Sequence, residues 1–280
     1  MRINERENKM DILKELMGTE DEKPLDRLVT DGGFCGIFRR ICCIGDSLSS
    51  GEFESSDGNN EHKGYHDMFD YSWGQYLGRL CGSTVLNYSR GGMTAKEFCN
   101  SYACDHGYWN VENACHAYII ALGVNDMHHL EMYGGEIGSV SDICKDDYKQ
   151  NKPTFVGYYA QIIQRMKKIQ PRAKFFLMTM PSEGYGPDHE KKLGKFSETI
   201  YEIADYFSNT YVLDFYKYAP KYDGEFKKNF YLGGHMNPCG YLLTAKMTAS
   251  YIDYIIRHNM KDFDQVGFIG TNLGNHGVVK

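Results

Sequence analysis

From residue 41 onward, the chain alternates between short apolar runs and longer amphipathic stretches. Short apolar runs bounded by turn residues predict strands at Ile41–Ile44, Thr84–Leu86, Ala117–Leu122, Lys174–Met180 and Thr210–Phe215. Apolar residues at helical spacing predict helices over Pro153–Ile169, with the proline at the first position, over Glu190–Phe207 and from Pro238 onward. Strands that alternate with helices imply a mostly parallel sheet covered on both faces, with ligands bound beyond the carboxyl ends of the strands.

The remaining segments set the expected domain organisation. Residues 1–30 are predicted to be a charged appendage with a short helix around Asp11–Leu16, and residues 31–280 a single domain. Two long polar segments, Ser49–Gly64 and Met127–Lys152, follow predicted strands and are expected to be loops that overhang the site. The tail Lys261–Lys280 is expected to pack as an extended segment.

The first predicted strand leads directly into a candidate nucleophile. It ends in the tight turn Gly45-Asp46-Ser47, which presents the Ser47 hydroxyl at the edge of the sheet with little backbone in the way. Nucleophilic attack on an ester requires such a hydroxyl, a base to take its proton and donors to hold the oxyanion. Taken alone, however, Gly-Asp-Ser is also an ordinary turn.

Three later segments offer the other parts of a hydrolytic site. Gly92 follows the second strand, where the absence of a Cβ lets a backbone N–H approach a ligand oxygen. Asn125 follows the third strand and has a side-chain amide that can donate to an oxyanion. His235 precedes the last helix, and its ordinary pKa near ~6.5 suits a general base. Each also has a plain alternative: a strand-to-helix turn, an Asx-turn and a structural histidine.

Together these four residues resemble the SGNH (GDSL-type) hydrolase superfamily. Ser47, Gly92, Asn125 in Gly-x-Asn-Asp, and His235 match the family's four named residues in the right order, over residues 45–240. The resemblance implies a three-layer α/β/α sandwich with a five-stranded parallel sheet, similar to flavodoxin. It also implies catalysis by Ser47 and His235, with an oxyanion hole formed by the Ser47 and Gly92 backbone N–H groups and the Asn125 side chain.

One position departs from the family pattern. Members usually carry an aspartate three residues before the histidine to orient its ring, and this chain has Leu232 there. We therefore expect a backbone carbonyl to face His235 Nδ1. The rival is a carboxylate from elsewhere in the chain, for which Asp214, Asp223 and Glu225 are the candidates.

The charge balance and cysteine content of the chain limit the partners and the cell compartment that we expect. The 31 basic and 37 acidic residues give a net charge of -6 without a basic cluster, which disfavours nucleic acid. The charged N-terminus has no apolar signal region, and no apolar run is long enough to span a membrane. The 9 scattered cysteines, with Cys42 and Cys43 expected on opposite faces of a strand, indicate reduced thiols in a cytoplasmic protein.

The sequence thus predicts a serine esterase acting on a small-molecule ester. We expect a small acyl group, acetyl in particular, on a carbohydrate or other polar alcohol. A lipase, lysophospholipase or thioesterase of the same fold, and a non-catalytic binding module, are the alternatives. No cofactor is expected: a Gly-rich phosphate loop is missing after the first strand, and the adjacent His128 and His129 lack a third spaced metal ligand.

Overall fold

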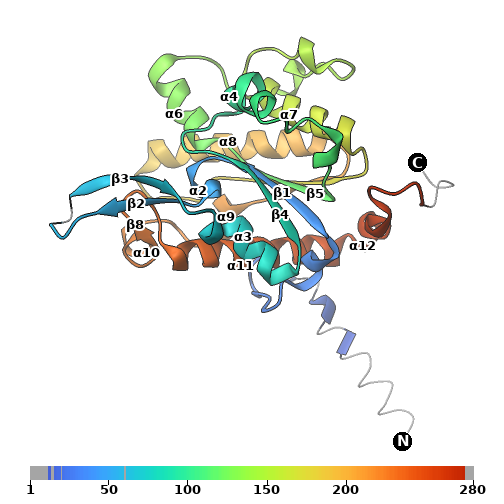
Figure 1. The fold of residues 1–280 in the computed structure, drawn as a ribbon, viewed down its shortest axis with the longest axis horizontal. Coiled ribbons are helices and arrows are strands. Elements are labelled where there is room, and N and C mark those ends of the chain that lie inside the picture. The colour runs from blue at the N-terminus through green and yellow to red at the C-terminus, as the bar shows by residue number, and fades with distance from the viewer. Residues whose placement is uncertain (1–11, 14–15, 20, 60, 275–280) are drawn as a thin grey trace, which may run out of the picture.

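A parallel five-stranded sheet forms the centre of the molecule (Figure 1). The computed structural model describes residues 12–13, 16–19, 21–59 and 61–274. The strands lie in the order β4-β1-β5-β6-β7. Their bounds are Arg40–Gly45 (β1), Thr84–Ser89 (β4), Ala117–Ala121 (β5), Lys174–Met178 (β6) and Thr210–Leu213 (β7). All five predicted strands are therefore confirmed, as is the α/β class with a five-stranded parallel sheet flanked by helices.

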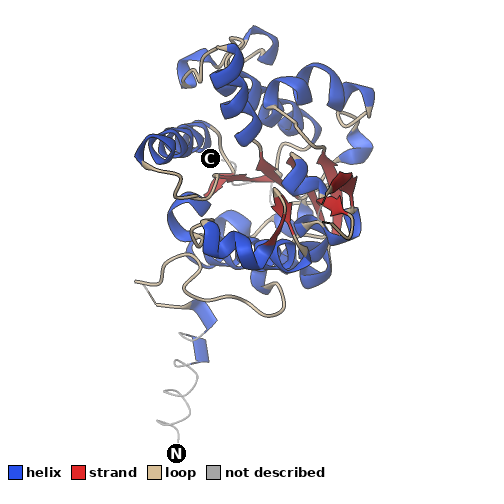
Figure 2. Ribbon diagram, turned by 90° about the vertical axis from the view of Figure 1, so that its left-hand side faces the viewer, coloured by secondary structure: helices blue, strands red, loops and turns tan. Residues whose placement is uncertain are grey.

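Helices cover both faces of this sheet (Figure 2). One face packs against α7 (Phe155–Ile169) and α8 (Pro187–Tyr206), and the other against α3 (Trp73–Cys81) and α11 (Pro238–His258). Cys42 lies in the first of these cores and Cys43 in the second, as the alternation of side chains along a strand requires. The other described helices are α2 (Ser47–Ser50), α4 (Ala95–Glu97), α5 (Ala103–Asp105), α6 (Val124–Tyr133), α9 (Phe215–Tyr218), α10 (Gly224–Phe230) and α12 (Met260–Phe263).

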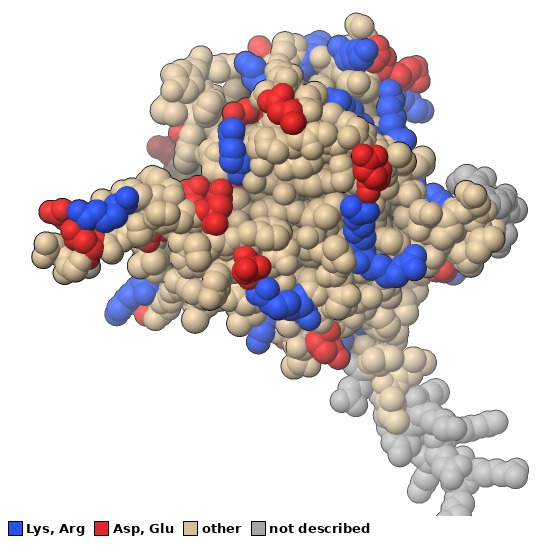
Figure 3. Space-filling view, viewed as in Figure 1, with Lys and Arg blue, Asp and Glu red and all other residues tan. Residues whose placement is uncertain are grey.

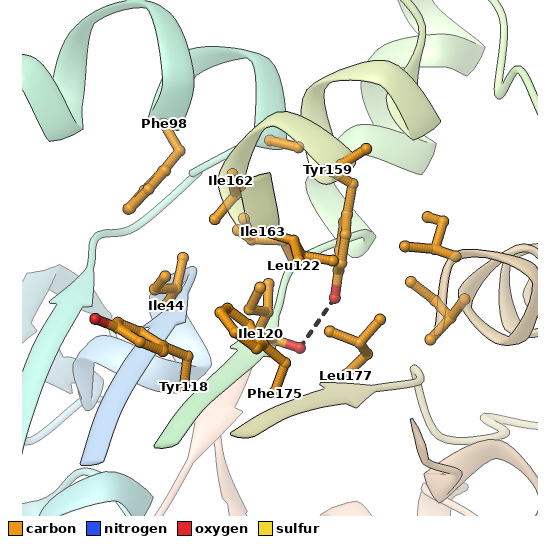
Figure 4. Close-up of a cluster of buried hydrophobic side chains, with 14 of the residues drawn as sticks. Ile44, Phe98, Tyr118, Ile120, Leu122, Tyr159, Ile162, Ile163, Phe175 and Leu177 are labelled. Atoms are coloured by element: carbon orange, nitrogen blue, oxygen red, sulfur yellow. Dashed lines mark hydrogen bonds between the residues drawn. The ribbon is translucent and has the colours of Figure 1, made fainter. Parts of the chain in front are cut away.

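The core under α7 is built from aromatic and aliphatic side chains (Figure 4). Tyr159 of α7 reaches down to the sheet, where its hydroxyl donates a hydrogen bond to the carbonyl oxygen of Ile120 at 3.1 Å. The helix begins at Phe155, because the Thr154 side chain accepts a hydrogen bond from Gly157 N and acts as the N-cap. The prediction that Pro153 occupies the first helical position is wrong by two residues.

The segment Ser49–Gly64 was expected to be a loop, but most of it belongs to a β-hairpin. Strands β2 (Glu52–Ser56) and β3 (His62–Asp67) pair antiparallel and project beyond the edge of the main sheet (Figure 1). Phe53 anchors the base of the hairpin by packing against Tyr71 and Tyr241. A second two-stranded sheet, β8 (Tyr231–Leu232) with β9 (His235–Met236), lies at the same end. Of the second expected loop, Met127–Lys152, the first part continues α6 to Tyr133.

Both ends of the described chain pack on the domain. Part of the helix expected around Asp11–Leu16 lies outside the described residues. Further along, Glu22 forms an ion pair with Arg257 of α11. The tail forms α12 and a 3-10 turn rather than an extended segment, and its Val266 and Ile269 are buried. Residues 275–280 lie outside the described residues.

Arg257 makes a testable contribution to stability. Its side chain is 2% exposed and pairs with Asp253 at 2.8 Å and with Glu22 at 2.6 Å. Replacing it by Met leaves the buried Asp253 carboxylate without its cation, and leaves Glu22 with only the more distant Arg27, at 3.8 Å. Removing one partner of a buried pair costs about 3–5 kcal/mol. We expect Arg257→Met to lower the free energy of unfolding in urea by that amount. The control is Lys192→Ala, which breaks the exposed Lys192–Glu131 pair and should leave the unfolding transition nearly unchanged. Equal losses in both variants would contradict the assignment.

Candidate active site

The segments that follow the neighbouring strands β4, β1 and β5 begin at the same edge of the sheet. In the sheet, Gly45 at the end of β1 is in register with Ser89 of β4 on one side and Ala121 of β5 on the other. The loops after these strands carry Ser47, Gly92 and Asn125. Because parallel strands end at the same edge, the three predicted residues are brought to one end of the sheet.

The nucleophile turn is shaped by its two neighbours in sequence. The Asp46 side chain accepts a hydrogen bond from Leu48 N at 3.1 Å and caps α2, whose first residue is Ser47. A Cβ at Gly45 would collide with the Ser49 side chain, so only glycine fits there. Ser47 is half-buried, and its hydroxyl makes no hydrogen bond to any described residue. It is therefore available to a ligand.

The turn after β4 is held by the first turn of α6, which follows β5. Gly92 has φ 72°, a left-handed conformation that favours glycine, and open space lies where its Cβ would be. Asn125 Nδ2 donates to Met93 O at 3.2 Å, and the Asp126 carboxylate accepts from Ala95 N at 3.0 Å. The amide of Asn125 carries a second N–H that this contact leaves for a ligand. Asn125 and Asp126 thus position the Gly92 turn.

His235 lies between two glutamates of the hairpin. Its Nδ1 is 2.8 Å from Glu54 Oε1, and the same oxygen accepts from Gly234 N at 2.7 Å. Its Nε2 is 3.1 Å from Glu52 Oε1. The edge of the ring faces Tyr65, with the ring centroids 5.6 Å apart. All three ionisable side chains are about 15% exposed, so these contacts are partly shielded from water.

The expectation that a backbone carbonyl faces Nδ1 is wrong, and so is each carboxylate named as its rival. Asp214 accepts from Thr179, Tyr201 and Lys217 N, as the N-cap of α9. Asp223 caps α10, and Glu225 lies in the first turn of that helix. These carboxylates serve local structure, and the one beside His235 Nδ1 is Glu54.

Leu232 cannot take the place of the usual aspartate. It is directly opposite His235 in the β8–β9 pair and is 47% exposed. The sequence did contain a signal for the residues that were missed. Glu52 and Glu54 are two apart and flank Phe53, which is the spacing of two side chains on one face of a strand with an apolar residue on the other.

Burial changes the acidity of the carboxyl groups around the site. Desolvation raises the pKa of Asp46 to about 6, partly opposed by its hydrogen bond from Leu48 and by His235. Desolvation also raises the pKa of Asp126 to about 7. The pKa of Glu52 is raised as well, first by burial and then by the nearby Asp67 and Glu54, against the effect of His235. The site therefore gathers several carboxyl groups in a region poor in water.

A largely apolar cavity of about 110 Å³ adjoins the nucleophile turn. Its walls include Asp46 and Leu48, Met180 after β6, and Met236 of β9. Ser47 and His235 are not part of these walls. The cavity thus adjoins the segments that carry Ser47 and His235, through the neighbouring residues Asp46, Leu48 and Met236.

Comparison with known proteins identifies the family. Residues 43–243, more than half of the chain, match the model of the GDSL-like Lipase/Acylhydrolase family. The chain belongs to this family. This GDSL-like acylhydrolase is accordingly a carboxylic ester hydrolase. No curated protein sequence matches it.

Several solved structures share the fold of this acylhydrolase. A family two carbohydrate esterase from Clostridium thermocellum, in complex with cellohexaose, is 15% identical with a TM-score of 0.52, over 86% of this chain and 66% of that one. A carbohydrate esterase family 2 enzyme with a carbohydrate binding domain, from Corynascus thermopiles (Myceliophthora fergusii), is 15% identical with a TM-score of 0.53, over 76% and 65%. The chain thus spans just under two thirds of both.

An acetyl xylan esterase, AlAXEase, is similar over nearly its whole length. It is 16% identical with a TM-score of 0.51, over 76% of this chain and 99% of that one. At these identities the likeness shows the fold alone. Within the described part of the acylhydrolase, no helix is long and apolar enough to cross a membrane.

The contact between Glu54 and His235 predicts the effect of removing the charge. Glu54→Gln keeps the size of the side chain but permits the wrong tautomer of His235 and no longer stabilises its imidazolium form. We expect kcat/KM on p-nitrophenyl acetate to fall by about 10³–10⁴-fold. Glu225→Gln is the matched control and is expected to change it less than about 2-fold. A Glu54→Gln protein that unfolds like the wild type and keeps its activity would contradict the positioning role.

The raised pKa of Asp126 predicts a pH dependence of stability. A carboxyl whose pKa rises from ~3.9 in the unfolded chain to about 7 in the folded one favours folding when protonated. Its contribution is complete below the unfolded pKa and is lost as pH rises through the folded one. Between pH 5 and pH 8, the free energy of urea unfolding should fall by roughly 2–3 kcal/mol more in the wild type than in Asp126→Asn, which keeps only the smaller fall due to carboxyls such as Asp46. The same loss in both proteins would refute the raised pKa.

Proposed function

We propose that this acylhydrolase is a serine esterase that removes a small acyl group, acetyl in particular, from a carbohydrate or other polar alcohol. The observation that carries the chemistry is His235, which is held at Nδ1 by Glu54 at the same end of the molecule as the unbonded hydroxyl of Ser47. Nucleophilic acyl transfer requires an oriented base and a free hydroxyl at one site, and both lie at this end of the molecule.

The proposed reaction has two halves. His235 Nε2 takes the proton of Ser47 as Oγ attacks the ester carbonyl, and the imidazolium that forms is stabilised by Glu54. The Gly92 and Ser47 backbone N–H groups and the Asn125 amide hold the oxyanion. Nε2 then returns the proton to the departing alcohol, which leaves an acyl-Ser47. In the second half, His235 activates water to release the acid and restore the hydroxyl.

A polar alcohol suits the surroundings of His235. Glu52 and Glu54 flank its ring, and Asp67 accepts from Ser50 Oγ at 2.6 Å within the same hairpin base. These carboxylates repel anionic head groups and attract hydroxyl donors. Tyr65 is 59% exposed beside the ring and offers an aromatic face to a sugar. Elsewhere on the face seen in Figure 3, acidic and basic side chains are interspersed.

The volume of the cavity next to Asp46 favours a substrate with a short acyl group. A cavity of about 150 Å³ holds one benzene molecule, so the 110 Å³ beside Asp46 has room for only a few carbon atoms. Two of the structures of similar fold are described as carbohydrate esterases and one as an acetyl xylan esterase. A lipase or lysophospholipase would need space for a long chain. Rates on p-nitrophenyl acetate, butyrate and octanoate distinguish the two: kcat/KM should fall with chain length.

Labelling by a fluorophosphonate probe tests the nucleophile. Because the Ser47 hydroxyl is free and adjoins the oxyanion donors, the wild-type protein should be modified at Ser47, as shown by peptide mass spectrometry. Ser47→Ala should lose both labelling and hydrolysis of acetylated sugars while its unfolding transition stays in place. The control is Ser50→Ala in the same short helix, which should still be labelled. Modification of a different serine in an active protein would rule out the proposed mechanism.

A further inference from the structure

Glu52 is not used by the mechanism above, yet its carboxylate lies in the middle of the site. Oε1 is 3.1 Å from His235 Nε2, the nitrogen that must exchange a proton with Ser47 and with the alcohol. On its other side the carboxylate borders Gly91, where an added Cβ would collide with Oε2. Glu52 therefore bridges the space between the base and the turn that carries Gly92.

This carboxylate lacks an aligned hydrogen-bond donor. Its backbone is fixed, since Tyr241 donates its hydroxyl to Glu52 O at 2.6 Å. Within the described residues, however, no group donates a hydrogen bond to the carboxylate, and its one close partner is the ion-pair contact with Nε2. The side chain is 15% exposed, and Glu54, Asp67 and Asp46 nearby are all acidic. A shielded carboxylate without a donor is costly unless a ligand supplies one.

The position of Nε2 locates that ligand atom. General acid catalysis brings the leaving oxygen of the ester within ~3 Å of Nε2. Since Glu52 Oε1 is 3.1 Å from the same nitrogen, the two oxygens lie at most about 6 Å apart. A hydroxyl on the carbon next to the ester oxygen can span that interval. An ionised carboxylate is an acceptor only, so a hydroxyl suits it and an ether or a second anion does not.

We propose that Glu52 is a specificity-determining residue that accepts a hydrogen bond from a hydroxyl adjacent to the ester on the alcohol side. The substrate class is thereby an acyl ester of a vicinal diol, such as a partly acylated sugar or polyol. This inference rests on the ester hydrolysis proposed at Ser47. It adds that the hydroxyl next to the ester is itself recognised.

Two acetates that differ in one donor test the proposal. 2-Hydroxyethyl acetate can donate to Glu52, whereas 2-methoxyethyl acetate has the same ester and no donor. A hydrogen bond to a charged group corresponds to about a 10-fold or greater preference in kcat/KM for the hydroxyl compound. Glu52→Ala, which removes the acceptor, should bring the ratio of the two values close to one, and Glu52→Gln should reduce it.

Glu54→Gln is the matched control, since it should lower kcat/KM for both acetates alike and leave their ratio unchanged. Hydrolysis of both acetates at equal rates by the wild type, or an unchanged ratio in folded Glu52→Ala, would overturn the role of Glu52 while leaving the esterase proposal intact. Failure of the folded wild type to hydrolyse either acetate or p-nitrophenyl acetate would overturn both proposals.

Discussion

The parallel pairing of β1 with β4 and β5 is the constraint on which the site depends. Backbone hydrogen bonds set the register of these strands, and in that register Gly45 lies between Ser89 and Ala121. The loops that follow must therefore begin side by side. Each can then carry a polar residue at the sheet edge without disturbing the apolar residues that face α7 on one side and α11 on the other.

The loops do not act separately. Asn125 and Asp126, after β5, bond to the backbone of Met93 and Ala95, after β4. This cross-link fixes the left-handed turn at Gly92 in place and makes Gly92 and Asn125, two of the proposed oxyanion donors, parts of one unit. The cost is a buried carboxyl in Asp126 whose pKa is raised to about 7 by desolvation. The hydrogen bonds that hold the Gly92 turn thus require a carboxyl that is costly to bury in its charged form, and such perturbed carboxyls are common in catalytic sites.

The sequence was sufficient for the five strands of the sheet and for the turns that follow them, because those features are local. A short apolar run between turn residues specifies a buried strand, and Gly45-Asp46-Ser47 or Gly92 is recognisable from its neighbours. Helix ends were less certain: Thr154 supplies a hydrogen bond that Pro153 cannot, and so decides where α7 begins.

Glu54, the carboxylate beside His235 Nδ1, could not be found from local sequence. The hairpin strands β2 and β3 carry mostly polar residues. They therefore lack the alternation of apolar and polar residues that identifies a strand, and their composition is typical of a loop. Glu54 is also 181 positions from His235, and only the folded hairpin brings them together. The carboxylates predicted instead lie closer to His235 in sequence, but two of them, Asp214 and Asp223, cap the helices α9 and α10.

That separation of 181 positions also orders the assembly of the site during synthesis on the ribosome. The serine turn, the hairpin and the segments that carry Gly92 and Asn125 are synthesised in the first half of translation, and His235 near the end. Contacts between such distant segments form slowly, because the entropy cost of closing a long loop comes before any stabilisation from the contacts. A nascent chain can thus build most of the pocket and remain inert until its last helix docks, so that ester cleavage reports on completed folding.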